Sequence, residues 1–192
     1  IEQSGFTDYI ASLSKAADME IKSYKDVISA LIKRVDYFNE HGCCVSDHAF
    51  NYMPFEPADD STIETAFQKA MNGDAYKTAV MTALGEKYYE LGWAMEIHLG
   101  AMRNNNTAKF KLLGPDTGFD SVGDDQTAYT LSRFLDSLEV KGKLPKTVLF
   151  NLNNKDNIVL ATMLGNFQGS EVESKIQFGP AWWFLDTMDG MT

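Results

Sequence analysis

The chain has 192 residues, of which 44% are hydrophobic and 12% aromatic, a composition typical of a folded globular protein. Its formal net charge of −10 argues against a nucleic-acid partner and against binding to an anionic membrane surface. No stretch approaches the roughly 20 apolar residues of a membrane span, and the first residues lack a signal-peptide pattern. Only two cysteines occur, and they are adjacent, so we expect no disulfide framework and a cytoplasmic location.

The first half of the chain alternates helical and extended patterns. Apolar residues at helical spacing predict four helices, and short β-branched or apolar runs predict two strands. Ser23 is a typical N-cap, and Ser61 with Glu64 forms a capping-box pattern. Gly92 is a natural C-cap. The expected helices span 6–13, 23–42, 61–73 and 75–91, and the expected strands span 43–47 and 93–99.

The second half continues the alternation after a long polar connection over residues 100–123. A connection of that length is uncommon in a compact domain and is usually functional. We then expect helices that begin at Asp124 or Asp125 and at Asn153 or Asn154, and strands over 146–152 and 175–179.

Repeated strand–helix units without a hairpin signal predict an α/β fold with a parallel sheet. Four strands make about half of a (β/α)8 barrel, which typically needs about 250 residues. We therefore expect one partial barrel domain over 1–192, an internal segment of a larger enzyme that lacks the first and last barrel strands. A self-contained flavodoxin-like domain is an alternative, but no phosphate-binding loop follows an early strand.

The most informative stretch is residues 95–106, where an apolar strand ends at His98 and is followed by Arg103 and the asparagines 104–106. The carboxyl ends of parallel strands collect the chemistry of α/β proteins. A neutral imidazole binds a metal or moves a proton, a guanidinium pairs with a carboxylate, and amides hydrogen-bond hydroxyls. These groups suit a small, anionic, polyhydroxylated substrate.

Polar or aromatic residues follow the other strands as well. Each has a structural interpretation beside the functional one, such as a buried core histidine, a surface ion pair, a helix cap or core packing. With three histidines and no H-x-H pair, a complete histidine-based metal site within the chain is not expected. Motifs for dinucleotides, nucleotides, serine hydrolysis and metalloproteases are absent. The strand-end residues are Asp47, His48, Asn151, Asn153, Asn154, Gln177, Trp182, Trp183 and Asp186.

Several stretches, in the same order along almost the whole chain, resemble the uronate (glucuronate) isomerase family of the amidohydrolase superfamily. They are Gly42–His48, His98–Asn106, Lys111–Ser121, Leu131–Leu138, Leu144–Thr147, Ala161–Gly169 and Lys175–Phe184.

The resemblance implies a distorted (β/α)8 barrel, a divalent metal (usually zinc) and a homo-oligomer. It implies isomerisation of D-glucuronate to D-fructuronate and of D-galacturonate to D-tagaturonate, through proton transfer between C2 and C1. Arg103 is expected to hold the substrate carboxylate. The tryptophans Trp182 and Trp183, expected to bind substrate, and Asp47, His48 and His98, expected to act in catalysis, match family positions near the pocket, with His98 as the one candidate metal ligand. From its place after the strand, Asn104 is a further candidate for substrate binding.

Two metal-ligand motifs of the family are missing, the H-x-H pair of the first strand and the aspartate of the last. The sequence therefore predicts the carboxylate site and pocket wall of a uronate isomerase rather than its whole metal centre. A non-catalytic sugar-acid binding or assembly module is the alternative.

Overall fold

The computed structural model describes residues 5–69 and 73–191. The chain divides into two compact units, each assembled from segments that are far apart in the sequence. The first unit comprises Ile1–Ser46, Pro54–Ala94 and Arg133–Pro145, and the second comprises Asp47–Met53, Met95–Ser132 and Lys146–Thr192.

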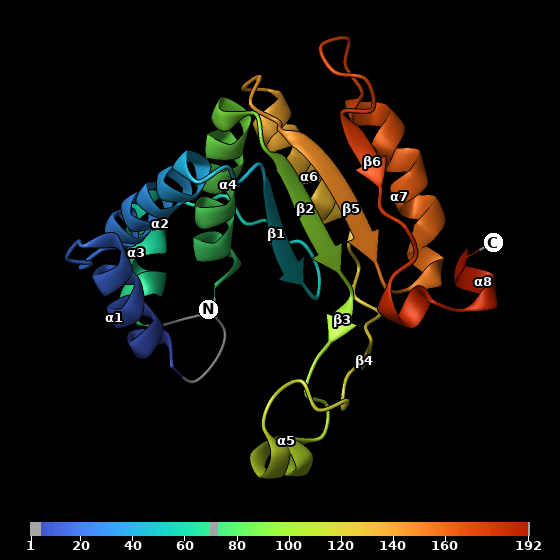
Figure 1. The fold of residues 1–192 in the computed structure, drawn as a ribbon, viewed down its shortest axis with the longest axis horizontal. Coiled ribbons are helices and arrows are strands. Elements are labelled where there is room, and N and C mark those ends of the chain that lie inside the picture. Colours follow the sequence, from blue (N-terminus) through green and yellow to red (C-terminus); the bar gives the residue numbers. More distant parts are fainter. Residues whose placement is uncertain (1–4, 70–72, 192) are drawn as a thin grey trace. The chain divides into compact units, whose positions relative to one another are not determined.

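The first unit is helical. Within it α2 packs on α1, α3 and α4, and α3 packs on α4 (Figure 1). A Cβ atom at Gly85 of α4 would lie 2.8 Å from Cδ1 of Leu138, so a glycine lets α4 approach α6 closely. The helices are α1 (Phe6–Ala17), α2 (Tyr24–Glu40), α3 (Asp60–Gln68), α4 (Asp74–Leu91) and the last part of α6 (Ala128–Glu139).

The helix starts show where capping was predicted correctly and where it was not. Ser23 caps α2, as expected, and its hydroxyl accepts from the backbone N–H of Asp26 at 3.2 Å. The capping box predicted at Ser61 is wrong, because Asp59 caps α3 and accepts from the backbone N–H of Thr62 at 2.8 Å. An aspartate placed just before the first turn satisfies the free N–H groups equally well. Residues 70–72, at the predicted end of this helix, lie outside the described residues.

The second unit is built on a four-stranded sheet in the order β1–β2–β5–β6. β5 and β6 pair in parallel, and the arrows of all four strands point the same way in Figure 1. The predicted α/β fold with a parallel sheet is therefore confirmed. The strands are β1 (Val45–Phe50), β2 (Ala94–Leu99), β5 (Lys146–Asn151) and β6 (Ile176–Phe178).

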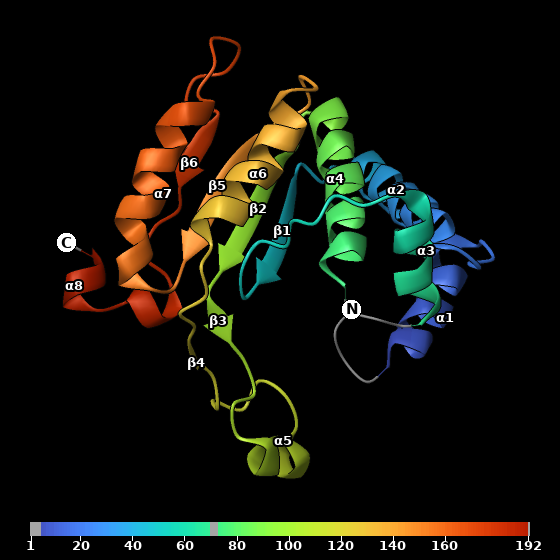
Figure 2. The ribbon, with the colours of Figure 1, turned by 180° about the vertical axis from the view of Figure 1, so that it is seen from behind.

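The two faces of this sheet differ. Met95, Ile97 and Leu99 of β2 are buried on one face. α7 (Asn157–Leu164) packs on β6, and Figures 1 and 2 show it on the side of that strand turned away from the viewer of Figure 1. Because side chains alternate along a strand, Glu96 and His98 share the opposite face.

The connection after β2 has structure of its own. β3 (Ala101–Met102) pairs antiparallel with β4 (Ser121–Val122), and α5 (Thr107–Leu113) lies between them. Figure 1 shows this segment projecting from the end of the sheet, so we call residues 101–122 the arm. The hairpin was not predicted, because strands of two residues show no alternation.

Short helices complete the second unit. They are the 3₁₀ helices η1 (Asn154–Asp156), η2 (Gly165–Phe167) and η3 (Trp183–Leu185), and the terminal α8 (Met188–Met191). Among the described residues, none of the helices is both long enough and apolar enough for a membrane span.

Candidate functional site

The centre of the candidate site is a hydrogen bond between two neighbouring strands of the second unit. Nδ1 of His98, on β2, lies 2.7 Å from Oδ1 of Asp47, on β1. The carboxylate only accepts, so Nδ1 of a neutral ring carries the proton and Nε2 carries the lone pair. Within the described part of the chain, no hydrogen bond engages Nε2. His98 is thus oriented as a proton acceptor, and its side chain is only 13% exposed.

Two aromatic side chains hold the imidazole in place. The ring of Phe150, on β5, stacks on His98 with centroids 4.2 Å apart and planes 4° from parallel. Trp182 meets the same imidazole edge-on, with centroids 4.4 Å apart. A Cβ atom at Gly179 would lie 2.2 Å from Cε1 of Phe150, so only glycine leaves room for that ring.

Arg103, at the base of the arm, lies among two carboxylates and an indole. Its Nη1 donates to Oδ1 of Asp116 at 3.2 Å and to Oδ2 of Asp120 at 3.5 Å. Its Cζ lies 5.0 Å from the ring centroid of Trp183, a cation–π distance. The side chain is 42% exposed and can reach a soluble anion.

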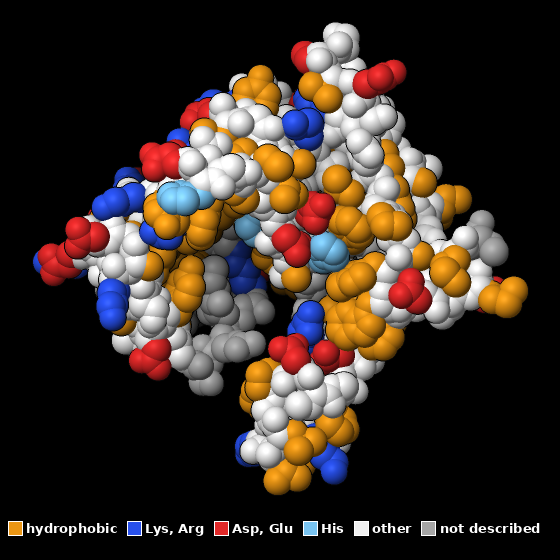
Figure 3. Space-filling view, in the orientation of Figure 1, with side chains coloured by type: hydrophobic (Ala, Val, Ile, Leu, Met, Phe, Trp, Pro, Cys, Tyr) orange, Lys and Arg blue, Asp and Glu red, His pale blue; other side chains and the backbone are white. Residues whose placement is uncertain are grey.

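A tryptophan pair connects the two parts of the site. Trp182 contacts His98, Trp183 contacts Arg103, and the centroids of the two indole rings are 5.5 Å apart. The imidazole and the guanidinium, predicted from one stretch of sequence, are therefore linked through aromatic side chains. In Figure 3, acidic, histidine, basic and hydrophobic side chains gather near the ends of β2 and β5.

Trp183 has a left-handed backbone conformation, with φ of 50°. This conformation is rare for bulky residues and persists only where surrounding contacts enforce it. Here it places consecutive indoles against Arg103 and His98, so the strained backbone serves the site.

Asn104 also has a left-handed backbone, with φ of 57°, which asparagine tolerates better than most residues. Its backbone N–H donates to Oδ1 of Asp120 at 2.7 Å. The contact seen is thus made by the backbone, whereas the sequence pointed to the side-chain amide.

His48 does not join His98. Adjacent residues of a strand face opposite sides, so His48 lies on the other face of β1 from Asp47. Burial lowers the pKa of His48, and the charge of Asp47 offsets only part of this effect.

The asparagines after β5 organise the backbone. Nδ2 of Asn151 donates to the side chain of Asn157 and to the carbonyl of Asn153. Nδ2 of Asn153 donates to the carbonyl of Gly123 at 2.9 Å, where the arm returns. These hydrogen bonds support a structural role for Asn151 and Asn153, because they connect the end of β5 to α7 and to the arm.

Three residues of the site were missed from the sequence. Phe150, Asp116 and Asp120 carry no local signal, because they reach the site only through strand pairing and the fold of the arm.

No group of three or more histidine, cysteine, aspartate or glutamate side chains within residues 5–69 and 73–191 could hold a metal ion. Asp47 and His98 form a pair only. The described residues therefore do not form a complete metal centre by themselves.

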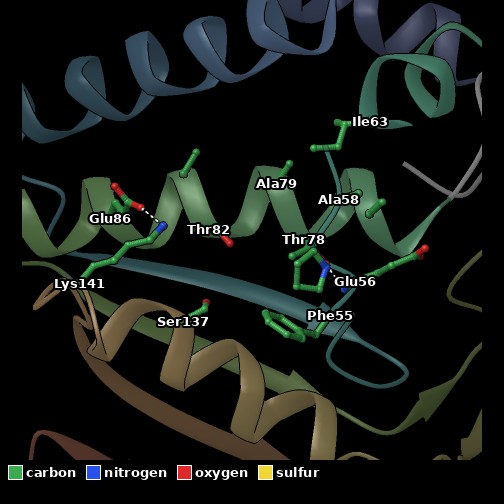
Figure 4. Close-up of a pocket in the computed structure, with 13 residues that line it drawn as sticks. Phe55, Glu56, Ala58, Ile63, Thr78, Ala79, Thr82, Glu86, Ser137 and Lys141 are labelled. Atoms are coloured by element: carbon green, nitrogen blue, oxygen red, sulfur yellow. Dashed lines mark hydrogen bonds and ion pairs between the residues drawn. The ribbon is translucent and has the colours of Figure 1, made fainter. Parts of the chain in front are cut away.

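The first unit has a separate pocket of about 410 Å³ between the loop at 55–58, α4 and the end of α6 (Figure 4). Small side chains of α4 line it, and Figure 4 shows an ion pair at one end, where Lys141 donates to Glu86 at 2.8 Å. None of the predicted site residues lines this pocket.

Comparison with known proteins now defines the family. The family model described as glucuronate isomerase matches residues 1–192. The chain belongs to the glucuronate isomerase family. The uronate isomerase of Caldanaerobacter subterraneus subsp. tengcongensis is 47% identical over 199 residues, and that of Salmonella heidelberg is 48% identical over 200.

Solved structures of glucuronate isomerases are similar to the chain as well. The uronate isomerase of Thermotoga maritima superposes with a TM-score of 0.87 at 28% identity, covering 99% of this chain and 42% of that one. The glucuronate isomerase of Caulobacter crescentus has a TM-score of 0.81 at 24% identity, covering 99% of this chain and 40% of that one. The sequence relatives are matched over 100% of this chain and 43% of their own length, so the chain spans less than half of each.

Proposed function

We propose that this chain provides the carboxylate-binding site and a proton-transfer group of a uronate isomerase acting on D-glucuronate and D-galacturonate. The observation that carries the proposal is the Trp182–Trp183 pair, which connects His98 to Arg103. An aldose–ketose isomerase for a sugar acid needs a base near C1 and C2 and a cation for the distant carboxylate. This part of the chain offers both.

Arg103 is suited to the carboxylate end of the substrate. A guanidinium has five N–H donors in a fixed plane and pairs with a carboxylate through two parallel hydrogen bonds. Both protein carboxylates contact the same nitrogen, Nη1, and the described residues give Nη2 and Nε no partner. Two adjacent donors therefore remain for a substrate carboxylate.

His98 is suited to the proton transfer. Nε2 takes the proton from C2 of the open-chain aldose, which leaves an enediol-like intermediate, and returns a proton to C1. The hydroxyl proton at O2 passes to O1, so atoms balance and the ketose forms. Asp47 favours the imidazolium that exists between the two transfers, because its carboxylate hydrogen-bonds Nδ1.

A divalent metal, which the family resemblance implies, would need ligands besides Asp47 and His98, and the steps above use none. The same proposal includes a cytoplasmic, homo-oligomeric enzyme whose partner is the small uronate substrate, with no nucleic acid or membrane.

The test measures conversion of D-glucuronate by a uronate isomerase that contains this chain, with and without Arg103→Ala. Loss of a charge-assisted contact of about 1.5–3 kcal/mol should lower kcat/KM roughly 10- to 150-fold. D-Glucose, which lacks the carboxylate, serves as the control ligand in calorimetric titrations. Its weak binding should be the same with and without Arg103→Ala. An unchanged kcat/KM for D-glucuronate would contradict the role of Arg103 in binding the substrate carboxylate.

The alternative is a sugar-acid binding module without turnover. It is favoured by one observation, that the described residues contain no metal-binding group of three ligands. Calorimetric titration with D-glucuronate, beside an activity assay with added zinc, on the full protein that contains this chain separates the two. Binding without turnover favours the module.

A further inference from the structure

We infer that Asp116 is an internal competitor for Arg103, and that Asp120 is the anchor that keeps the guanidinium in place. In this arrangement the Asp116 carboxylate occupies Arg103 until an anionic substrate displaces it. The inference rests on the proposed role of Arg103 in binding the substrate carboxylate. It adds that a carboxylate of the protein competes with the substrate for the same guanidinium.

The two carboxylates that contact Arg103 differ in burial and in their other bonds. The side chain of Asp120 is 7% exposed, and it also accepts the backbone N–H of Asn104 at 2.7 Å. The side chain of Asp116 is 79% exposed, and within the described residues Arg103 is its one polar partner. Asp120 is therefore fixed by two bonds, whereas Asp116 is held by a single exposed ion pair that water and ions weaken.

The charges explain why Asp116 must leave. Arg103 with both aspartates carries a net charge of −1, which repels a substrate carboxylate. Once Asp116 turns away, Arg103 and Asp120 form a neutral pair, so a carboxylate that approaches Nη2 and Nε no longer meets a net negative charge. A carboxylate on a side chain is the same chemical group that a uronate presents, so the two compete for one cation.

The backbone around Asp116 limits the substitutions that can test this displacement. Gly114 and Gly118 have φ of 84° and 89°, and Asp116 between them has φ of 57°. Glycine adopts these conformations without strain, and aspartate or asparagine tolerates them better than other side chains do. Asp116→Asn is therefore the substitution that removes the charge and keeps the turn.

The experiment measures KM and kcat for D-glucuronate in a uronate isomerase that contains this chain. Asp116→Asn should lower KM roughly two- to fivefold, the range expected for one exposed ion pair, with little change in kcat. Asp120→Asn should raise KM, because Arg103 loses its anchor. The matched control is Asp124→Asn, since Asp124 is an equally exposed carboxylate that pairs with Lys155 at 2.8 Å instead of Arg103.

The outcomes distinguish this inference from the proposed function. If Arg103→Ala raises KM but Asp116→Asn leaves it unchanged or raises it, the competitor role is overturned and the function stands. If Arg103→Ala leaves KM and kcat/KM unchanged, the proposed function itself fails. A fall in KM that Asp124→Asn reproduces equally would be an effect of overall charge and would also overturn the inference. Circular dichroism confirms that each variant is folded.

Discussion

Nδ1 of His98 lies 2.7 Å from Oδ1 of Asp47, although 51 positions separate the two residues in the chain. Neighbouring strands of the sheet bring them together, and the bond selects the tautomer in which Nε2 accepts a proton. The partner of Nδ1 therefore determines what the other nitrogen can do.

Asp47→Asn should leave substrate binding intact and slow the proton transfer. An amide that accepts from Nδ1 no longer supplies a negative charge to stabilise the imidazolium, so we expect kcat to fall by about 10²-fold, with KM little changed. Steady-state kinetics with D-glucuronate measure both constants. A lowered kcat/KM that came wholly from KM would contradict the role of Asp47.

Gly179→Ala should disturb His98 indirectly, through the ring of Phe150. The added Cβ would overlap the ring of Phe150, and because that ring stacks on His98, a shift of Phe150 would disturb the imidazole. We expect a loss of about 1–3 kcal/mol in the free energy of unfolding, together with a reduced kcat.

The matched control for that change is Gly165→Ala, because a Cβ there meets nothing within 4 Å and the backbone is helical. Thermal unfolding should show Gly165→Ala as neutral or slightly stabilising. Adding Phe150→Leu to Gly179→Ala should restore part of the stability, since the smaller side chain makes room. Equal melting temperatures for the two alanine variants would rule out the proposed overlap.

The ionisation of Glu86 should make the free energy of unfolding depend on pH in the acid range. Burial alone would raise the pKa of Glu86, but its ion pairs with Lys141 at 2.8 Å and Lys143 at 2.9 Å outweigh burial and lower it. A carboxyl whose pKa is lower when folded stabilises the protein above its unfolded pKa of about 4.3. That stabilisation disappears as the pH falls through the folded pKa.

Glu86→Gln should therefore lower the free energy of unfolding by about 1 kcal/mol at pH 7, and the difference from the unchanged protein should vanish at strongly acid pH. Urea unfolding at the two pH values measures this. Glu20→Gln is the control, because its pair with Lys22 at 2.8 Å is largely exposed at both side chains and should have no measurable effect. A difference that persisted unchanged in acid would show that the ion pairs are not its source.

The parallel sheet was predicted from the sequence, because the patterns that indicate strands and helices are local properties. Asp47 and His98 were predicted only as residues at the ends of two strands, and their hydrogen bond became visible with the strand order of the sheet. The alternation of side chains along a strand argues against grouping His48 with Asp47, since neighbouring residues in a strand point apart. The contacts of Asp116 and Asp120 with Arg103 could not be predicted from such local patterns, because only the fold of the arm brings these residues close to Arg103.

The chain has three tryptophans, and two of them form the pair that touches both ends of the site. The third, Trp93, belongs to the first unit, is 3% exposed, and donates from its ring nitrogen to Asn39. Indole fluorescence is sensitive to nearby charges and to contact with water. Replacing Trp93 by phenylalanine would thus leave Trp182 and Trp183 as the fluorescent indoles of this chain. The change in their emission during titration with an acidic sugar would then report how much of the site is occupied.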